Sequence, residues 1–251
     1  MSKSKWAYCS VSISPVRSEA ADPSEIVSQL LFGELFEVEE INAPWARIRI
    51  LNDGYEGYID HKHLRPLREK EFKRWSEGLD YQQAREQEIQ TPWGKQRICR
   101  GSCLPGGQRK FNIGDDQFAL LGSEYDHFED PVAMAKDYLN TPYLWGGKSP
   151  FGIDCSGIVQ IIYRCFGKNL PRDASEQVDY GNDVEFEDRA AGDLAYFTNS
   201  KGKVTHVGIL SDRDHIIHAA GHVREDYFTE AGIIHSEHGG YTHPLHCVKR
   251  V

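Results

Sequence analysis

Two adjacent segments decide how this chain folds: YLWGG at residues 143–147 and IDCSGIV at residues 153–159. The first is rich in glycine and predicts a turn, and the second predicts the start of a helix. Asp154 is placed to cap this helix and Gly167 to end it. Apolar residues recur at helical spacing between the two ends, at Cys155, Ile158, Val159, Ile162 and Phe166. The sequence therefore predicts a helix with a cysteine in its first turn.

The position of Cys155 suits a nucleophile. A thiol in the first turn faces the positive end of the helix dipole, which favours the thiolate. Buried cysteines are also common core residues, and a single cysteine is structural more often than catalytic. The interpretation of Cys155 therefore depends on whether the chain supplies a base for it.

Composition limits the classes of protein to consider. The chain has 251 residues, of which 39% are hydrophobic and 27% charged, which predicts two or three globular domains. A net charge of -9 without a basic stripe argues against binding to nucleic acid. No apolar run is long enough to span a membrane, and we expect no membrane association and a monomer.

The beginning of the chain and its cysteines bear on the compartment. Residues 1–6 lead into polar sequence without an apolar signal core, which predicts a cytoplasmic location. A signal peptide replaced by a start methionine would look the same, and the location would then be periplasmic or extracellular. Six scattered cysteines favour reduced thiols, and the lone pair Cys99 and Cys103 is a weak zinc signal. We expect no metal and no other cofactor.

Residues 1–66 predict a small β-barrel. Residues 45–50 alternate strictly between apolar and polar, and Asn52-Asp53-Gly54 predicts a hairpin turn after them. A short helix is predicted from Asp22 to Gly33, as a loop insertion with a capping start and a glycine stop. The order of these features resembles a bacterial SH3-like domain, which implies binding to peptides or cell-wall polymers.

Residues 67–126 are predicted to form a linker and a second, diverged SH3-like module. The charged stretch that begins this segment has Phe72, Trp75 and Leu79 at helical spacing. Alternation over residues 118–121 predicts a strand near its end.

Residues 127–251 predict an α+β domain. An amphipathic helix begins at Pro131, and the cysteine helix follows it. Strands are then predicted near residues 193–197, 204–210, 215–219 and 245–248. Helices followed by an antiparallel sheet define the α+β class.

Two histidines in these strands are candidates for the base. His206 and His218 both lie between apolar neighbours. They share a face of the sheet only if the numbers of directly paired residues on the two strands add up to an even number. A two-residue loop at residues 212 and 213 would separate them, whereas a three-residue loop or a bulge would bring them together. We expect an odd-length loop, with both histidines on the face that meets Cys155. A lone strand histidine is more often a packed structural residue, but two of them after a helix-start cysteine favour catalysis.

The chain resembles the NlpC/P60 cysteine peptidases in several motifs. They are Pro142-Tyr143-Leu144-Trp145-Gly146-Gly147, Asp154-Cys155-Ser156-Gly157, Leu170-Pro171-Arg172-Asp173, Thr205-His206-Val207-Gly208-Ile209 and His218-Ala219. The resemblance covers roughly residues 128 to 251 and implies a papain-like fold. It implies Cys155 as nucleophile, His206 as base and His218 as the residue that orients the base. It also implies that Tyr143 and a backbone N–H at the helix start assist the oxyanion.

Members of this family commonly hydrolyse the bond between the γ-carboxyl of D-glutamate and the diamino acid of cell-wall (murein) peptides. SH3-like modules ahead of the catalytic domain are similar to the cytoplasmic branch that recycles such peptides. In that branch, the barrel closes one end of the cleft and recognises the free amine of an N-terminal L-alanine.

From this resemblance we expect six substrate-binding residues: Asp154, Ser156, Asp173, Ser175, Tyr58 and Glu25. Asp154 has an equally good structural interpretation as a helix cap. Relatives often carry a small hydroxyl residue directly after the position of Asp173. This chain has Ala174 there and then Ser175, so one hydrogen bond to the substrate is expected to be lost or moved.

Three alternatives stay open on the sequence alone. The same thiol machinery serves amidases and acyltransferases that act on other acyl substrates. A non-catalytic wall-binding protein is a second alternative, although the complete set of Cys155, His206 and His218 argues against it. A metal site is a third, because three HxxH pairs occur: His215 with His218, His235 with His238, and His243 with His246. On strands, each pair would point to opposite faces.

Overall fold

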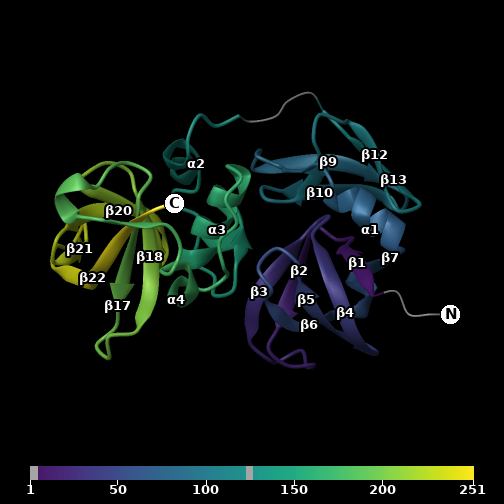
Figure 1. Ribbon diagram of the computed structural model, residues 1–251, viewed down its shortest axis with the longest axis horizontal. Helices are drawn as coiled ribbons and strands as arrows, with labels where there is room; N and C mark the ends of the chain where they lie inside the picture. The colour runs from purple at the N-terminus through teal and green to yellow at the C-terminus, as the bar shows by residue number, and fades with distance from the viewer. Residues whose placement is uncertain (1–4, 123–126) are drawn as a thin grey trace. The chain divides into compact units, whose positions relative to one another are not determined.

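A computed structural model describes residues 5–122 and 127–251. The chain forms two compact units, Met1–His127 and Phe128–Val251. The first, purple to teal in Figure 1, is mainly β-structure, and the second, teal to yellow, combines helices with a sheet. Among the described residues, no helix has both the length and the apolar character needed to cross a lipid bilayer.

The first unit begins with an antiparallel sheet of seven strands in the order β3-β2-β6-β5-β4-β1-β7. The alternation predicted for residues 45–50 is observed in β5, where Ala46, Ile48 and Ile50 are buried while the two arginines between them are exposed. The strands are β1 Trp6–Cys9, β2 Ile13–Arg17, β3 Ile26–Leu31, β4 Leu35–Asn42, β5 Trp45–Ile50, β6 Glu56–Asp60 and β7 Leu64–Leu67, with a 3-10 turn at His61–His63. This is the SH3-like barrel expected from the sequence.

The helix predicted between Asp22 and Gly33 is wrong, because that segment supplies strand β3. The capping signal instead forms a turn in which Ser24 donates to the carbonyl of Ala21 from its amide at 3.1 Å and its hydroxyl at 2.7 Å. The apolar residues that follow pair with β2, which lies earlier in the chain. A short apolar run fits a strand or a buried helix equally well, and the partner strand decides between them.

The rest of the first unit is a second β module that shares a core with the barrel. Helix α1 (Glu69–Ser76) leads into β8 Leu79–Tyr81, β9 Glu86–Thr91, β10 Gly94–Cys99, β11 Cys103–Pro105, β12 Lys110–Ile113 and β13 Asp116–Leu120. Phe32 and Leu35 of the barrel pack in one cluster with Ile89, Phe111 and Phe118 of this module. The description of residues 67–126 as a second SH3-like module stays a prediction.

Trp75 of α1 joins the barrel to the second β module. Its Nε1 donates to the carbonyl oxygen of Gly33 at 2.9 Å, and its ring stacks on Phe111 with centroids 5.8 Å apart. Because the ring is 5% exposed, it contributes both burial and a hydrogen bond to the shared core.

We expect Trp75→Ala to destabilise the first unit by about 3–5 kcal/mol, the usual cost of removing a buried aromatic side chain. Denaturant unfolding followed by tryptophan fluorescence measures this, because four of the five tryptophans lie in this unit, at positions 6, 45, 75 and 93. Trp93→Ala is the matched control, since Trp93 is 43% exposed and its removal should cost less than about 1 kcal/mol. Equal losses from both variants would contradict this role.

The second unit places helices before an antiparallel sheet, which confirms the α+β class. Its helices are α2 Pro131–Asp137, α3 Cys155–Cys165 and α4 Ala174–Gln177, and a short ribbon of β14 Lys148–Ser149 and β15 Gly152–Ile153 precedes α3. The sheet has the order β16-β22-β17-β18-β19-β20-β21, with a further pairing of β21 to β22. Its strands are β16 Asn182–Val184, β17 Leu194–Thr198, β18 Val204–Leu210, β19 His215–Ala220, β20 His222–Thr229, β21 Gly232–Ile234 and β22 Tyr241–Arg250, with a 3-10 turn at Phe186–Asp188. Helices α3 and α4 both pack against β18, as Figure 1 shows.

Candidate active site

Cys155 is the first residue of α3, as the sequence predicts. The carboxylate of Asp154 caps the helix by accepting from the backbone N–H of Gly157 at 2.7 Å. The same carboxylate accepts from the N–H of Gly146 at 2.8 Å and so fixes the preceding turn. The thiol is 5% exposed, and its sulfur lies 4.0 Å from the carbonyl oxygen of Thr205 on β18. The cap therefore places the thiol beside β18, the central strand of the sheet.

The glycines of the two signature segments are required by close packing. A Cβ on Gly157 would lie 2.3 Å from the carbonyl oxygen of Gly147, and a Cβ on Gly147 would lie 2.4 Å from that of Gly152. Real Cβ atoms do not approach backbone oxygens this closely. The turn can therefore pack against the first turn of α3 only if no side chain is present at these positions.

A buried arginine completes the surroundings of Asp154. Arg172 donates to the two carboxylate oxygens at 3.0 and 2.5 Å and to the hydroxyl of Ser156 at 2.9 Å. The sequence did not single out Arg172, although it precedes Asp173 in one of the family motifs. A bidentate guanidinium–carboxylate pair is rigid, so it locks the residues on both sides of the thiol.

His206 and His218 share one face of the sheet, as predicted. The β18–β19 hairpin pairs Ile209 with Ile217 and Leu210 with Ile216, so the numbers of paired residues add up to an even number. This register leaves a three-residue loop at 212–214. His206 Nε2 lies 2.8 Å from His218 Nδ1, and both rings are buried. His206 lies on β18, the strand that α3 packs against and whose Thr205 carbonyl borders the thiol, and His218 lies on the neighbouring strand β19.

Asp226 extends this chain of hydrogen bonds and was missed in the sequence. His218 Nε2 lies 2.9 Å from its Oδ2, and both side chains are fully buried. Arg224 Nε also donates to Oδ2 at 2.8 Å, and the backbone N–H of Ser236 donates to Oδ1 at 2.9 Å. The sequence carries a signal for this contact, because the charged residues Arg224 and Asp226 occupy alternate positions, but strand β20 was not predicted. Without that strand, nothing placed Asp226 beside His218.

His243 of β22 covers one face of the His206 ring. Its ring stacks on His206 with centroids 4.2 Å apart and meets His218 edge-on at 5.7 Å. Its own Nδ1 lies 2.8 Å from the hydroxyl of Thr242. The contact with His206 is therefore one of ring faces, which shields the His206–His218 hydrogen bond from water.

Comparison with known proteins agrees with this geometry. Residues 140–242 match the NlpC/P60 family, and residues 16–64 match the bacterial dipeptidyl-peptidase SH3 domain. A probable endopeptidase of Haemophilus influenzae is 38% identical over 130 residues, which cover 51% of this chain and 70% of that protein. This chain belongs to the NlpC/P60 family.

The curated relatives of this NlpC/P60 chain match only part of it, whereas one solved structure matches nearly all of its fold. A γ-D-glutamyl-L-lysine dipeptidyl-peptidase of Bacillus subtilis is 40% identical over 133 residues, covering 52% of this chain and 40% of that protein. The chain thus spans less than half the length of that relative. A crystal structure of an NlpC/P60 family protein from Bacillus cereus has a TM-score of 0.77 at 20% identity, covering 98% of this chain and 99% of that one. At that identity, the similarity concerns the fold alone.

Burial controls the protonation of this NlpC/P60 site. Burial, followed by the nearby Asp154 carboxylate, raises the pKa of Cys155 to about 12, although the N–H groups of Val207 and Ser156 oppose the rise. Burial likewise holds the pKa of His206 well below its usual value, aided by His218. Both shifts favour the neutral thiol and the neutral imidazole. The thiolate expected from the helix start alone does not dominate, because burial outweighs the helix dipole.

We expect alkylation of Cys155 by iodoacetamide to accelerate about tenfold per pH unit from pH 7 to 10. The reason is that the thiolate fraction rises tenfold per unit while the pH is below a thiol pKa of about 12. Peptide mapping by mass spectrometry isolates Cys155 from the other thiols, and half-buried Cys247 serves as an internal comparison. A rate that is already constant from about pH 6 would instead indicate a resting thiolate–imidazolium pair.

The remaining expected residues lie in both units. Tyr143 is half-buried near the thiol, and its pKa rises to about 12 through burial and the neighbouring Cys155 and Asp154 charges. Asp173 precedes α4 and is partly buried, whereas Ser175 on that helix is exposed. Tyr58 and Glu25 belong to the first unit. Tyr58 pairs with Arg17 of β2 on one side, and Glu25 directly precedes Ile26, which pairs with Arg17 on the other side.

Two groups of described residues hold three potential metal ligands within 4.8 Å of one another: His206, His218 and His243, and also His235, Glu237 and His238. In the first group, the His206–His218 hydrogen bond uses two of the nitrogens, so we interpret this group as hydrogen-bonded histidines and not as a metal site. In the second, the rings of His235 and His238 stack at 4.6 Å. The expectation that HxxH pairs point apart applies to strands, and this pair lies in a turn.

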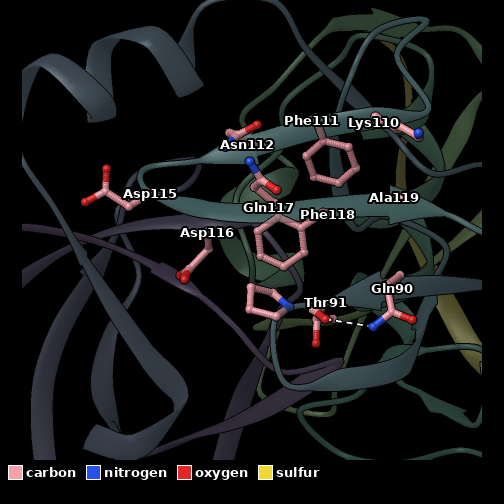
Figure 2. Close-up of a pocket in the computed structure, with 11 residues that line it drawn as sticks. Gln90, Thr91, Lys110, Phe111, Asn112, Asp115, Asp116, Gln117, Phe118 and Ala119 are labelled. Atoms are coloured by element: carbon pink, nitrogen blue, oxygen red, sulfur yellow. Dashed lines mark hydrogen bonds between the residues drawn. The ribbon is translucent and has the colours of Figure 1, made fainter.

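The first unit carries an open cavity of about 710 Å³ over β9, β12 and β13 (Figure 2). Phe111 and Phe118 lie side by side in its middle, with stacked rings 5.4 Å apart, and amide side chains flank them. Among the described residues that line it there is no cysteine or histidine. This cavity therefore offers no thiol and base, and the candidate active site is the one around Cys155.

Proposed function

We propose that this chain is a cysteine endopeptidase that hydrolyses the γ-D-glutamyl–diamino acid bond of cell-wall peptides with a free N-terminal L-alanine. The observation that carries the proposal is the thiol at the start of α3, held against β18, which with β19 supplies a hydrogen-bonded pair of buried histidines. A thiol needs a base and an orienting group in order to attack an amide, and this arrangement supplies both.

The proposed reaction begins at the His206 nitrogen that does not face His218. Since Nε2 bonds to His218, Nδ1 is the nitrogen that accepts the thiol proton as Cys155 sulfur attacks the γ-amide carbon. The tetrahedral intermediate then collapses, and His206 gives the proton to the departing amine of the diamino acid. A thioester remains on Cys155. Water, deprotonated by His206, hydrolyses this thioester and releases the D-glutamyl carboxylate and the free thiol.

Oxyanion stabilisation is assigned to Tyr143 and to a backbone N–H at the start of α3. Because the pKa of Tyr143 is raised to about 12, its phenol stays protonated at neutral pH and can donate a hydrogen bond. Donors aimed at the developing negative charge lower the barrier of acyl transfer. Tyr143 therefore acts in this scheme as a donor and not as a base.

Recognition of the substrate amine is assigned to Asp154, Ser156, Asp173, Ser175, Tyr58 and Glu25. The name of the Bacillus subtilis relative supports a free amine as the recognised group, because a dipeptidyl-peptidase counts residues from the N-terminus. Asp154 already accepts hydrogen bonds from Gly146, Gly157 and Arg172, so its contribution to the amine is mainly through its charge. Glu25 is exposed to solvent and is therefore accessible to an amine. A cytoplasmic location and a monomeric state belong to the same proposal.

We expect the chain to cleave L-Ala-γ-D-Glu-diaminopimelate or L-Ala-γ-D-Glu-L-Lys after D-glutamate. Acetylation of the alanine nitrogen should lower kcat/KM about 100-fold, because it removes a charge-assisted hydrogen bond worth about 3 kcal/mol. Product analysis by mass spectrometry gives the bond that is cleaved, and initial rates on paired peptides give the ratio.

Cys155→Ala should abolish cleavage, whereas Cys247→Ala is the matched control and should leave it intact. A strong chelator should not change the rate of a thiol peptidase. Equal rates on the free and acetylated peptides would refute amine recognition while leaving the peptidase in place. Failure to cleave either peptide, with Cys155 still reactive toward electrophiles, would favour an amidase or acyltransferase acting on another acyl group.

A further inference from the structure

We propose that Asp226 is a positioning residue that fixes the tautomers of both histidines and thereby makes His206 Nδ1 the base. This inference rests on the proposed function, in which His206 takes the proton of Cys155. It adds a fourth residue, from β20, to the Cys155, His206 and His218 set.

The surroundings of Asp226 keep it an ionised hydrogen-bond acceptor. Burial alone would raise the pKa of Asp226, but hydrogen bonds from His218, the Ser236 N–H and Arg224 outweigh burial and hold the pKa far below its usual value. Arg224 is itself fixed, because its Nη1 donates to the carbonyl of Ala220 at 2.9 Å. The carboxylate is thus fully buried and held at both oxygens, and it has no proton to donate.

The direction of both hydrogen bonds follows from this carboxylate. An ionised carboxylate only accepts, so His218 must carry its proton on Nε2, the nitrogen 2.9 Å from Asp226. Burial lowers the pKa of His218 as well, so the ring is neutral and its Nδ1 bears a lone pair. His206 must then donate its Nε2 proton to that lone pair across 2.8 Å. The lone pair of neutral His206 is left on Nδ1, ready to accept the thiol proton.

Without the carboxylate, the opposite arrangement becomes available. His218 could then donate from Nδ1, and His206 would accept at Nε2 and carry its own proton on Nδ1. In that tautomer, His206 cannot deprotonate Cys155. His243 does not resolve the choice, because it meets His206 through its ring face and its Nδ1 lies beside Thr242.

Asp226→Asn is the sharpest substitution, because it keeps the shape and removes the charge. The asparagine amide has only one oxygen. It therefore cannot accept the hydrogen bond from the Ser236 N–H and also those from Arg224 and His218, which reach different carboxylate oxygens of Asp226. We expect kcat to fall about 10- to 100-fold, in the range found for residues that orient a ligand or base, while KM changes less than about threefold. Steady-state kinetics on the tripeptide measures this split.

The matched control is Glu225→Gln, which removes a neighbouring negative charge from the same strand. Adjacent strand residues point to opposite faces, so Glu225 does not face the histidines. We expect its kcat to stay within twofold of the unsubstituted chain. A fall in kcat for both variants, or for neither, would overturn the proposal.

A second measurement does not need the substrate. In the full chain labelled with ¹⁵N-histidine, the tautomers are identified by NMR, and the two rings are assigned from His206→Ala and His218→Ala spectra. We expect both neutral rings to carry the proton on Nε2, and Asp226→Asn to give the Nδ1–H form of His206. A His206 proton on Nδ1 in the unsubstituted chain would overturn the proposal even if the Asn variant fails to fold. If the peptides are not cleaved at all, the tautomers still test this inference separately from the proposed function.

Discussion

The structure of the site depends on one buried carboxylate, that of Asp154. It caps α3, fixes the turn through Gly146 and pairs with Arg172, so three separate segments meet at two oxygen atoms. A buried charge is tolerated only when such donors surround it, and removing one partner of a buried pair typically costs about 3–5 kcal/mol. The position of Cys155 is therefore a consequence of how the Asp154 charge is satisfied.

Burial has two different effects on the site around Cys155, one on ionisation and one on hydrogen bonding. It suppresses ionisation of Cys155 and of His206, which protects the thiol from reaction in the absence of a substrate. The same exclusion of water strengthens the hydrogen bonds between the histidines and Asp226, because the local dielectric constant is low. Burial therefore favours neutral forms of the thiol and of His206, while it strengthens the hydrogen bonds that hold His206 in place.

The accuracy of prediction followed the range of the interactions involved. The cysteine helix, β5 and the common face of His206 and His218 depend on local periodicity and loop length, and the sequence carries both. Strand β3 was mistaken for a helix because its apolar run fits either form until β2 pairs with it. Asp226 and Arg172 were missed for a related reason, since their partners lie eight and eighteen residues away and only tertiary packing brings them together.

The three-residue loop at 212–214 carries a constraint that surface hairpins usually lack. Turns at the tips of hairpins commonly accept insertions and deletions, because few contacts depend on them. Here, if the loop stayed at three residues, adding or removing a single residue would shift the register of β18 and β19 by one and turn His218 to the far side of the sheet. A change in the length of this segment is therefore compatible with the site only where the loop itself takes up the change and the register of β18 and β19 is kept.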